Sequence, residues 1–359
     1  MTNDRISLRQ LLTLTFAALL SPAIRILPGR TARIAGEGGW LAALAALPVL
    51  LALCWVVYAL LQKGNGGLGE AALTTLGPVL GRAVVGFYLV WGLFLLAANA
   101  RLVALRFLTV SYRNAPLPLF LAALLALTLW LGVKPVRVLA RAGEVFYLAL
   151  VIGLGLSLAM GAFQMDPGRI LPLWGEDLPK IGAAALPVLG LLGYGIFAAF
   201  LGGNVERRPG GRRKTMRWAV GFCLTLTALQ AVCLGNFGPG LSVRMNTPFF
   251  MMVKGIGIEG TFQRVESVIL ALWVLSDLAL LGLLTRACTK MAGQILPVKG
   301  EKWVVLTLVL LALVGALRLF PDAFFLNHTM ERLALWGNLI AGFGLPALLL
   351  LVKKLRRQE

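Results

Sequence analysis

The stretch SPAIRILPG, Ser21–Gly29, interrupts an apolar run that is long enough to cross a membrane. Proline removes a backbone donor and pushes the residue before it out of the α region, so Pro22 and Pro28 threaten the helix twice. In lipid, freed backbone groups are tolerated only where they face protein or water. The stretch therefore predicts a membrane helix that is broken beside a central cavity. A kinked helix with a proline at its outer end is the alternative.

The rest of the chain has the composition of a polytopic membrane protein. Of its 359 residues, 59% are apolar, and the mean hydropathy is +0.85. Soluble domains are about 45–50% apolar. We expect one all-α membrane domain over residues 1–359, because backbone groups in lipid need partners within their own segment. The ten expected helices lie near 8–28, 40–62, 83–109, 117–133, 143–162, 181–203, 218–234, 265–287, 303–319 and 334–352.

These ten transmembrane helices divide into five plus five, which predicts an inverted repeat with one half at about 8–162 and the other at about 181–352. The sixth helix contains Pro187 and several glycines. We therefore expect helices 1 and 6, each the first of its half, to be broken. Broken helices at corresponding positions of two repeats are typical of transporter folds. Since both breaks free backbone groups, we expect Ser21 to Arg25 and Gly190 to Gly195 to meet across one cavity.

The candidate ligand-binding residues follow from these breaks. On the third segment, Asn99 lies on the same face of the helix as Tyr88. Asn99 either lines a cavity or packs against a neighbouring helix. Arg106 continues this face, and its expected role is to reach the outer interface. The expected ligand-binding residues are Ser21, Pro22, Ala23, Ile24, Arg25, Asn99, Gly190, Gly193, Tyr194, Gly195 and Trp273.

The eighth segment carries two acidic residues in line with an aromatic. Glu266, Trp273 and Asp277 lie within about 20° of one line on the helix. A carboxylate as deep as Asp277 must be paired, protonated or hydrated, so it either couples a proton or cation or pairs with an arginine such as Arg25. Glu266 is about 16 Å nearer the outer surface, and it is either a second coupling residue or an interfacial one.

The basic residues predict the orientation of the chain. The net charge is +19, but Lys and Arg lie at the ends of apolar segments, which indicates membrane headgroups rather than nucleic acid. With a cytoplasmic N-terminus, 21 of the 34 basic residues face the cytoplasm. Both termini and the 204–217 loop are therefore expected inside. The four cysteines are scattered and there is one histidine, so we expect neither a disulfide nor a metal site, and we expect no cofactor. The sequence contains no hydrolytic motif, so we do not expect an enzyme.

Several stretches together resemble one family. ISLRQLLTLTFAALLSPAIRILPG, LARAGEVFYLAL and, most specifically, GTFQRVESVILALWVLSDLALLGLL are similar to the B subunits of bacterial spore germinant receptors. These spore permeases belong to the amino acid–polyamine–organocation superfamily. The resemblance implies a five-plus-five fold, a germinant ligand, commonly a small amino acid, and A-type and C-type partner subunits in the spore inner membrane. Relatives often carry a GSG-like break where this chain has SPAIR, so Arg25 either holds a carboxylate or replaces a bound cation.

Two functions stay open at this point. One is a receptor subunit that binds a nutrient, signals to partner subunits and triggers spore germination. The other is a proton- or cation-coupled amino-acid permease in the bacterial cell membrane. One fold and one pocket serve both functions, so the sequence alone does not separate them. A lipid- or ion-conducting channel is a weaker third alternative, because no ring of charges is evident.

Overall fold

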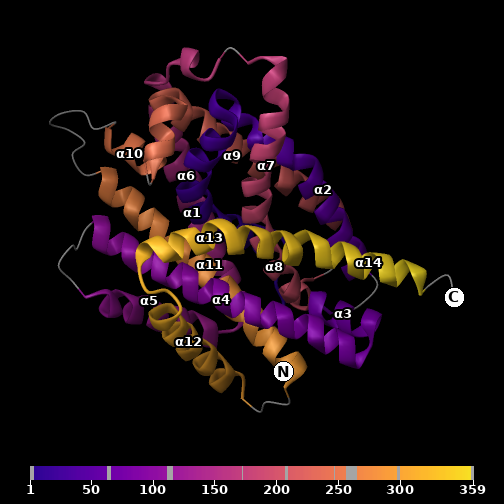
Figure 1. Cartoon of the computed structure of the whole chain (residues 1–359). Helices are drawn as coiled ribbons and strands as arrows, with labels where there is room; N and C mark the ends of the chain where they lie inside the picture. The colour runs from indigo at the N-terminus through magenta and orange to yellow at the C-terminus, as the bar shows by residue number, and fades with distance from the viewer. Residues whose placement is uncertain are drawn as a thin grey trace.

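The computed structural model describes residues 4–62, 66–110, 116–171, 173–206, 209–245, 247–255, 265–296 and 300–356, without the side chains of 109–110 and 265–269. The described part is helical almost throughout (Figure 1), apart from an isolated parallel bridge between Ile6 and Val205. Its helices are α1 (Leu8–Ala35), α2 (Ala42–Leu61), α3 (Leu68–Leu76), α4 (Pro78–Val110), α5 (Leu117–Val133), α6 (Val136–Phe163), α7 (Leu178–Leu192), α8 (Ile196–Phe200), α9 (Gly211–Arg244), α10 (Pro248–Gly255), α11 (Val265–Ile295), α12 (Glu301–Arg318), α13 (Ala323–Leu339) and α14 (Leu345–Leu355).

Short turns of other helix types join some of these elements. A π turn, Ile340–Gly344, joins α13 to α14, so that the two form one long rod across the front of the molecule (Figure 1). α9 is kinked at Gly238, which has a φ of 71° just before Pro239. The 3₁₀ turns are Gly36–Leu41, Pro167–Arg169, Gly175–Asp177, Gly193–Gly195 and Leu201–Asn204.

The protein is an integral membrane protein. Within the described residues, seven helical stretches are long and apolar enough to cross a membrane, and α5 is a shorter apolar helix. The first stretch, Leu8–Leu61, contains both α1 and α2. The seven stretches are Leu8–Leu61, Pro78–Leu108, Val136–Phe163, Gly175–Asn204, Gly211–Arg244, Leu270–Ile295 and Ala323–Leu355.

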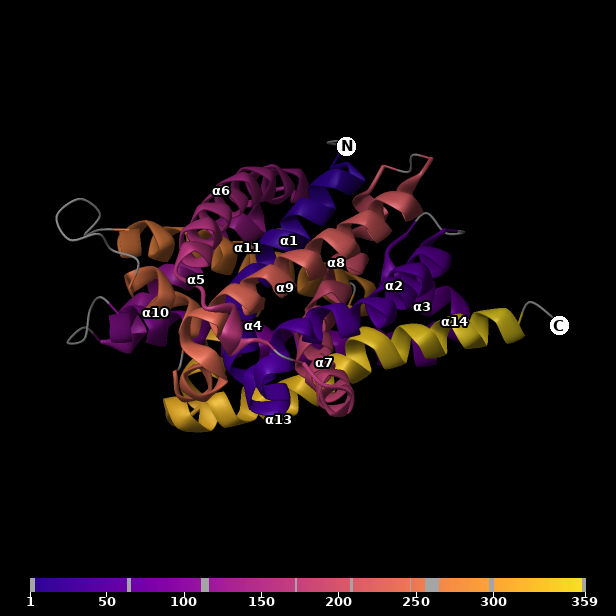
Figure 2. The same ribbon diagram turned by 90° about the horizontal axis from the view of Figure 1, so that it is seen from above.

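α1 and α11 lie inside the bundle. α1 packs against α6, α7, α9 and α11, and α11 also packs against α4, α5, α6 and α12. Seen from above (Figure 2), α6 lies along one flank and α13–α14 along the other, with α1, α9 and α11 between them. The side chains of Leu14, Leu19 and Leu20 on α1 are completely buried. The polar groups of α1 must therefore find their partners within the protein.

The predicted break in helix 1 is wrong, because α1 is helical from Leu8 to Ala35 with Pro22 and Pro28 inside it. Just before Pro22, a side chain of α11 bridges the backbone of α1. The Ser21 amide donates to Oγ of Ser276 at 2.7 Å, and that hydroxyl donates to the Ala17 carbonyl at 2.5 Å. A side chain of α11 thus inserts into the hydrogen-bond ladder of α1 and satisfies the groups that the proline displaces, so the helix need not unwind.

The sixth predicted segment changes its helix type at the predicted glycines. α7 ends at Leu192, a 3₁₀ turn covers Gly193–Gly195, and α8 follows to Phe200. The residues that flank this turn keep right-handed helical dihedrals, so the chain tightens there and does not unwind. A 3₁₀ stretch in the middle of a helix often marks a functional hinge or a sequence under strain.

Two buried arginines hold α4, α5, α11 and α12 together. Arg101 on α4 donates to the Ala316 carbonyl near the end of α12 at 2.6 Å. Arg286 on α11 donates to the Gly132 carbonyl near the end of α5 at 2.9 Å and pairs with Glu301 on α12 at 2.8 Å. The last carbonyls of a helix lack partners within it and carry partial negative charge, so a cation there satisfies them.

Candidate functional site

An ion pair lies within the membrane-spanning bundle, between α4 and α11. Nη1 of Arg106 lies 2.9 Å from Oδ2 of Asp277, and the two side chains are 11% and 3% exposed. A charge inside a membrane is costly unless it is paired, and such residues mark functional sites. Asp277 is therefore paired, as one of the sequence alternatives required. Its ion-pair partner is Arg106 and not Arg25, and Arg106 does not extend to the outer interface as we had expected.

Ser21 on α1 joins this ion pair. Its hydroxyl donates to Oδ1 of Asp277 at 2.5 Å and accepts weaker contacts from the Arg106 guanidinium at 3.4 Å. The neighbouring Ser276 bridges the backbone of α1 as described above. Adjacent residues of α11 therefore bind the backbone and the side chain of Ser21, and they fix the place where α1, α4 and α11 meet.

An aromatic wall closes the same place. The Arg106 guanidinium carbon lies 4.6 Å from the centre of the Trp273 ring, a cation–π contact. Trp273 in turn stacks on Phe250 of α10, with ring centres 5.8 Å apart. The buried indole nitrogen of Trp273 has no hydrogen-bond partner among the described residues. A buried donor without a partner is costly, so it is a group that a ligand oxygen or a water can satisfy.

Arg25 is the second cation of the site. It lies within electrostatic range of Arg106, Asp277 and Tyr194. Among the described residues it has no ion-pair partner, since Asp277 is held by Arg106. We call Ser21, Arg25, Arg106, Trp273 and Asp277 the charged cluster. Its two arginines and one carboxylate leave one positive charge without a fixed counter-charge.

Amides and hydroxyls connect the charged cluster to α7 and α13. The Asn99 side-chain nitrogen donates to the Tyr194 hydroxyl at 3.1 Å and to the Leu95 carbonyl at 2.8 Å. Asn338 on α13 donates to the Gly190 carbonyl at 2.9 Å and accepts from the Trp91 indole at 3.0 Å. Tyr194 lies within electrostatic range of Arg25 and so links the two groups. We call Trp91, Asn99, Tyr194 and Asn338 the amide cluster.

The predicted glycines have a packing role in this structure. A Cβ on Gly193 would lie 2.5 Å from the Asn338 carbonyl oxygen, and one on Gly342 would lie 2.6 Å from the Gly193 Cα. Gly190 lies against Leu335, and Gly195 faces Leu19 and Thr15. These glycines let the 3₁₀ turn and the π turn touch. Pro22, Ala23 and Ile24 are buried within α1 and contribute apolar packing.

The donor set shows which chemistry the site can perform. Within the described residues, no group of three His, Cys, Asp or Glu is placed to hold a metal ion. The charged cluster offers guanidinium groups, one carboxylate, one hydroxyl and one free indole N–H. These groups bind carboxylates, ammonium groups and hydrogen-bonding atoms, and bidentate recognition of a carboxylate is typical of arginine.

Comparison with known proteins identifies the family. The family model described as Spore germination protein matches residues 5–321. The chain belongs to this family, the spore permeases. Spore germination protein KB of Bacillus subtilis (strain 168) is 22% identical to this spore permease over 273 residues, which cover 74% of this chain and 72% of the relative. The family comprises membrane proteins without enzymatic activity.

A solved transporter has the same fold. The structure described as a substrate-bound, outward-open state of a Na⁺-coupled sialic acid symporter matches this spore permease with a TM-score of 0.66 and 11% identity. The match covers 95% of this chain and 79% of the symporter. At this identity the likeness shows the fold alone.

Sequence reasoning missed some residues of the candidate site. Arg106 lies on the stripe that contains Tyr88 and Asn99, and this stripe was a sufficient signal for its inward direction. Ser276 and Asn338 are single polar residues in apolar segments, and the spacing of the chain says nothing about what they bind. The predicted coupling residue Glu266 belongs to α11, but its side chain lies outside the described residues.

Proposed function

We propose that this spore permease is a germinant receptor subunit that binds a small amino acid at the charged cluster and triggers spore germination. The observation that carries the proposal is the charge of this cluster. Arg25 and Arg106 face one carboxylate, Asp277, inside the bundle. A ligand that brings one carboxylate supplies the missing negative charge, and its ammonium group then needs an anionic partner.

The mechanism is an exchange of charge partners. The ligand carboxylate binds between Arg25 and Arg106, and the Trp273 indole donates to it. The ammonium group binds Asp277 and the Ser21 hydroxyl. Because Arg106 and Asp277 then share their charge with the ligand, the direct contact between α4 and α11 weakens. This changes how α1, α4 and α11 fit together, and the change is the signal that reaches the partner subunits.

Several finer features belong to the same proposal. Ten helices cross the membrane, arranged as two inverted repeats at about 8–162 and 181–352, within one domain over 1–359. Both termini face the cytoplasm, and the membrane is the bacterial cell membrane or the spore inner membrane. The partners are A-type and C-type receptor subunits. Membership of the spore permease family supports these assignments, and so does the fold shared with a symporter.

Coupled transport is the second candidate function. The fold is shared with a Na⁺-coupled symporter, and Asp277 is a carboxylate inside the bundle. In a proton- or cation-coupled amino-acid permease, Asp277 and Glu266 bind the coupling ion, and the ligand crosses the bilayer.

Two measurements on the purified full chain test these functions. Thermal stabilisation by individual amino acids reports binding, and at about one hundred times Kd a ligand stabilises the protein by about 2.7 kcal/mol. Uptake of the same amino acids into liposomes reports transport. Stabilisation without uptake supports the receptor, and saturable uptake supports the permease. If no amino acid stabilises the protein or enters the liposomes, the ligand class is wrong.

One variant separates ligand binding from structural damage. Arg25 has no ion-pair partner among the described residues and lies near a second cation. Arg25→Gln therefore relieves repulsion, and we expect a melting temperature equal to or above that of the parent chain with loss of amino-acid stabilisation. The matched control is Arg30→Gln, which removes a cation one turn further along the same helix. If Arg25→Gln retains full stabilisation, the carboxylate does not bind there.

A further inference from the structure

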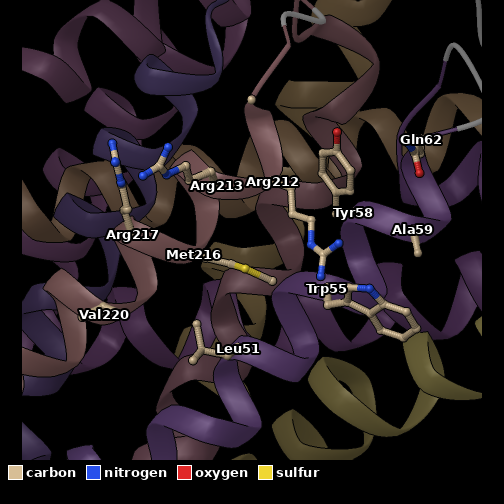
Figure 3. Close-up of a pocket in the computed structure, with 11 residues that line it drawn as sticks. Leu51, Trp55, Tyr58, Ala59, Gln62, Arg212, Arg213, Met216, Arg217 and Val220 are labelled. Carbon is tan, nitrogen blue, oxygen red and sulfur yellow. The ribbon is translucent and has the colours of Figure 1, made fainter.

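A groove lies between α2 and α9, away from the charged cluster. Its volume is about 820 Å³, and residues of α2 and of the first part of α9 line it (Figure 3). The two helices pack against each other along the groove. Neither the charged cluster nor the amide cluster contributes a residue to its lining.

The lining carries positive charge only. Arg212, Arg213 and Arg217 belong to it, and none of its residues is acidic. All three arginines are exposed, and none has an ion-pair partner among the described residues. Figure 3 shows the Arg212 side chain reaching towards Trp55, while Arg213 and Arg217 point to the other side of the groove. Lys354 of α14 lies over the Trp55 ring at 5.3 Å and adds a fourth cation.

The groove changes from basic to apolar along its length. A Cβ on Gly211 would lie 3.5 Å from the Tyr58 ring, so the end of α2 meets the start of α9. The three arginines lie within the first two turns of α9, next to this end. Leu51 lies about 16 Å from Gln62 along α2, at 1.5 Å per residue, and Val220 is the corresponding apolar residue of α9. A ligand that fits has an anionic head and an apolar body of about this length.

The aromatic residues favour a ligand at the membrane interface. Trp55 and Tyr58 lie on α2 at the basic end of the groove. Trp and Tyr gather at the level of the headgroups, where an amphipathic ring meets both water and hydrocarbon. Basic pockets between membrane helices bind anionic headgroups. An acidic protein segment would satisfy the arginines, but it gives no reason for the apolar part that extends towards Leu51 and Val220.

We propose that this groove is a specific site for one acidic phospholipid, with the phosphodiester beside Arg212 and Trp55, further positive charge from Arg213 and Arg217, and an acyl chain along Leu51 and Val220. The bound lipid neutralises charges that the described residues leave unpaired. It also joins α2 to α9, and through Trp55 and Lys354 it extends to α14. The site is independent of the amino-acid site proposed above.

Native mass spectrometry of the full chain tests the site, with phosphatidylglycerol and phosphatidylcholine of equal chain length in competition. We expect one retained phosphatidylglycerol. The variant Arg212→Gln with Arg213→Gln and Arg217→Gln should reduce this preference by roughly a hundredfold, since each basic side chain near an anionic surface contributes about fivefold. The matched control, Lys134→Gln with Arg137→Gln and Arg141→Gln, removes the same charge from the turn between α5 and α6 and the start of α6, which do not line the groove, and should keep the preference.

A second variant tests the groove without altering its charge. Ala59→Trp places a large side chain in the lining, and it should reduce retention of phosphatidylglycerol although all three arginines are present. Retention at the parent level in Ala59→Trp, or equal losses in the two triple variants, would show diffuse attraction and overturn the proposal. Glycerophosphoglycerol, the headgroup without acyl chains, should compete weakly. Competition as strong as that of the whole lipid would show a phosphate site, and selective release by an acidic peptide would show a protein site.

Discussion

Arg106 and Asp277 connect two membrane helices through a charge pair that excludes most solvent. Such a pair gives little net stability compared with apolar residues of similar volume, but removing one partner leaves a buried charge uncompensated. The pair is therefore better explained by function than by folding. Ser21 hydrogen-bonds to Asp277, and the Trp273 ring contacts Arg106, so both members of the pair have further partners within the protein.

The first prediction concerns this pair. Asp277→Asn leaves the Arg106 charge without its partner, and we expect it to destabilise the protein by about 3–5 kcal/mol. Arg106→Gln should do the same, and the double variant should lose about 1–3 kcal/mol less than the sum of the two. Thermal unfolding of the purified chain measures all three. Glu331→Gln is the control, because the Glu331 carboxylate is 43% exposed and pairs with Arg30 at 3.5 Å, so its cost should be below about 1 kcal/mol. Strict additivity would contradict the pairing.

The second prediction concerns the hydroxyl that bridges α1. Ser276→Ala leaves the Ser21 amide and the Ala17 carbonyl without a partner, so we expect a loss of about 1–3 kcal/mol. Ser157→Ala is the matched control, because its buried hydroxyl only donates to the Gly153 carbonyl of its own helix. Thermal unfolding compares the two variants. Equal losses would show that the bridge contributes no stability to α1.

At the scale of elements, two irregular turns touch each other where the chain has glycine. The 3₁₀ turn of Gly193–Gly195 meets the π turn of Ile340–Gly344, and Gly193 and Gly342 allow backbone contact. π turns inside α-helices occur frequently at functional sites. Asn338, two residues before the π turn, donates to the Gly190 carbonyl. The amide cluster thus fixes α7 against α13 at the level where both helices change type.

The third prediction concerns this contact. A Cβ on Gly193 lies 2.5 Å from a backbone oxygen, so Gly193→Ala requires two helices to move apart, and we expect a loss of about 1–3 kcal/mol. Gly155→Ala on α6 is the control. Nothing lies within 4 Å of its Cβ position, and alanine stabilises a helix by about 0.5–1 kcal/mol relative to glycine. Thermal unfolding should therefore show a lower melting temperature for Gly193→Ala and a higher one for Gly155→Ala. A gain in both variants would show that the turns are not in contact.

The helices show what periodicity predicts well and where it stops. Long apolar runs predicted the membrane class and the approximate place of the long helices, because lipid allows few other structures, but they did not predict the short helices α3 and α10. The break in helix 1 was predicted from its prolines and was wrong, because α1 stays helical through them and Ser276, far away in the chain, bridges the Ser21 amide and the Ala17 carbonyl. The glycines of the sixth segment correctly marked where the helix changes its type. A sequence does not tell a glycine that allows close packing from one that lines a ligand site. The pairing of Arg106 with Asp277 depends on how α4 packs against α11, which the sequence pattern does not show.

At the scale of the whole molecule, basic residues gather where the ends of several helices meet. The Ile6 amide donates to the Asn204 carbonyl at 2.8 Å, and the Glu206 amide donates to the Ile6 carbonyl at 2.9 Å. Lys353 of α14 donates to the Leu60 carbonyl at the end of α2, and the proposed lipid groove opens nearby. The N-terminal segment, the turn after α8, the end of α2 and the end of α14 therefore belong to one end of the bundle.

The last prediction concerns which side of the membrane this end faces. Basic residues concentrate there, and basic loops stay in the cytoplasm. We expect Lys214→Cys, on the exposed start of α9, to react with a membrane-impermeant maleimide only after the cells are opened. Glu176→Cys is the control at the far end of the α7–α8 stretch, and it should react in intact cells. The four native cysteines are buried, so they give little background. Labelling of Lys214→Cys but not Glu176→Cys in intact cells would reverse the orientation, and with it the leaflet that supplies lipid to the groove.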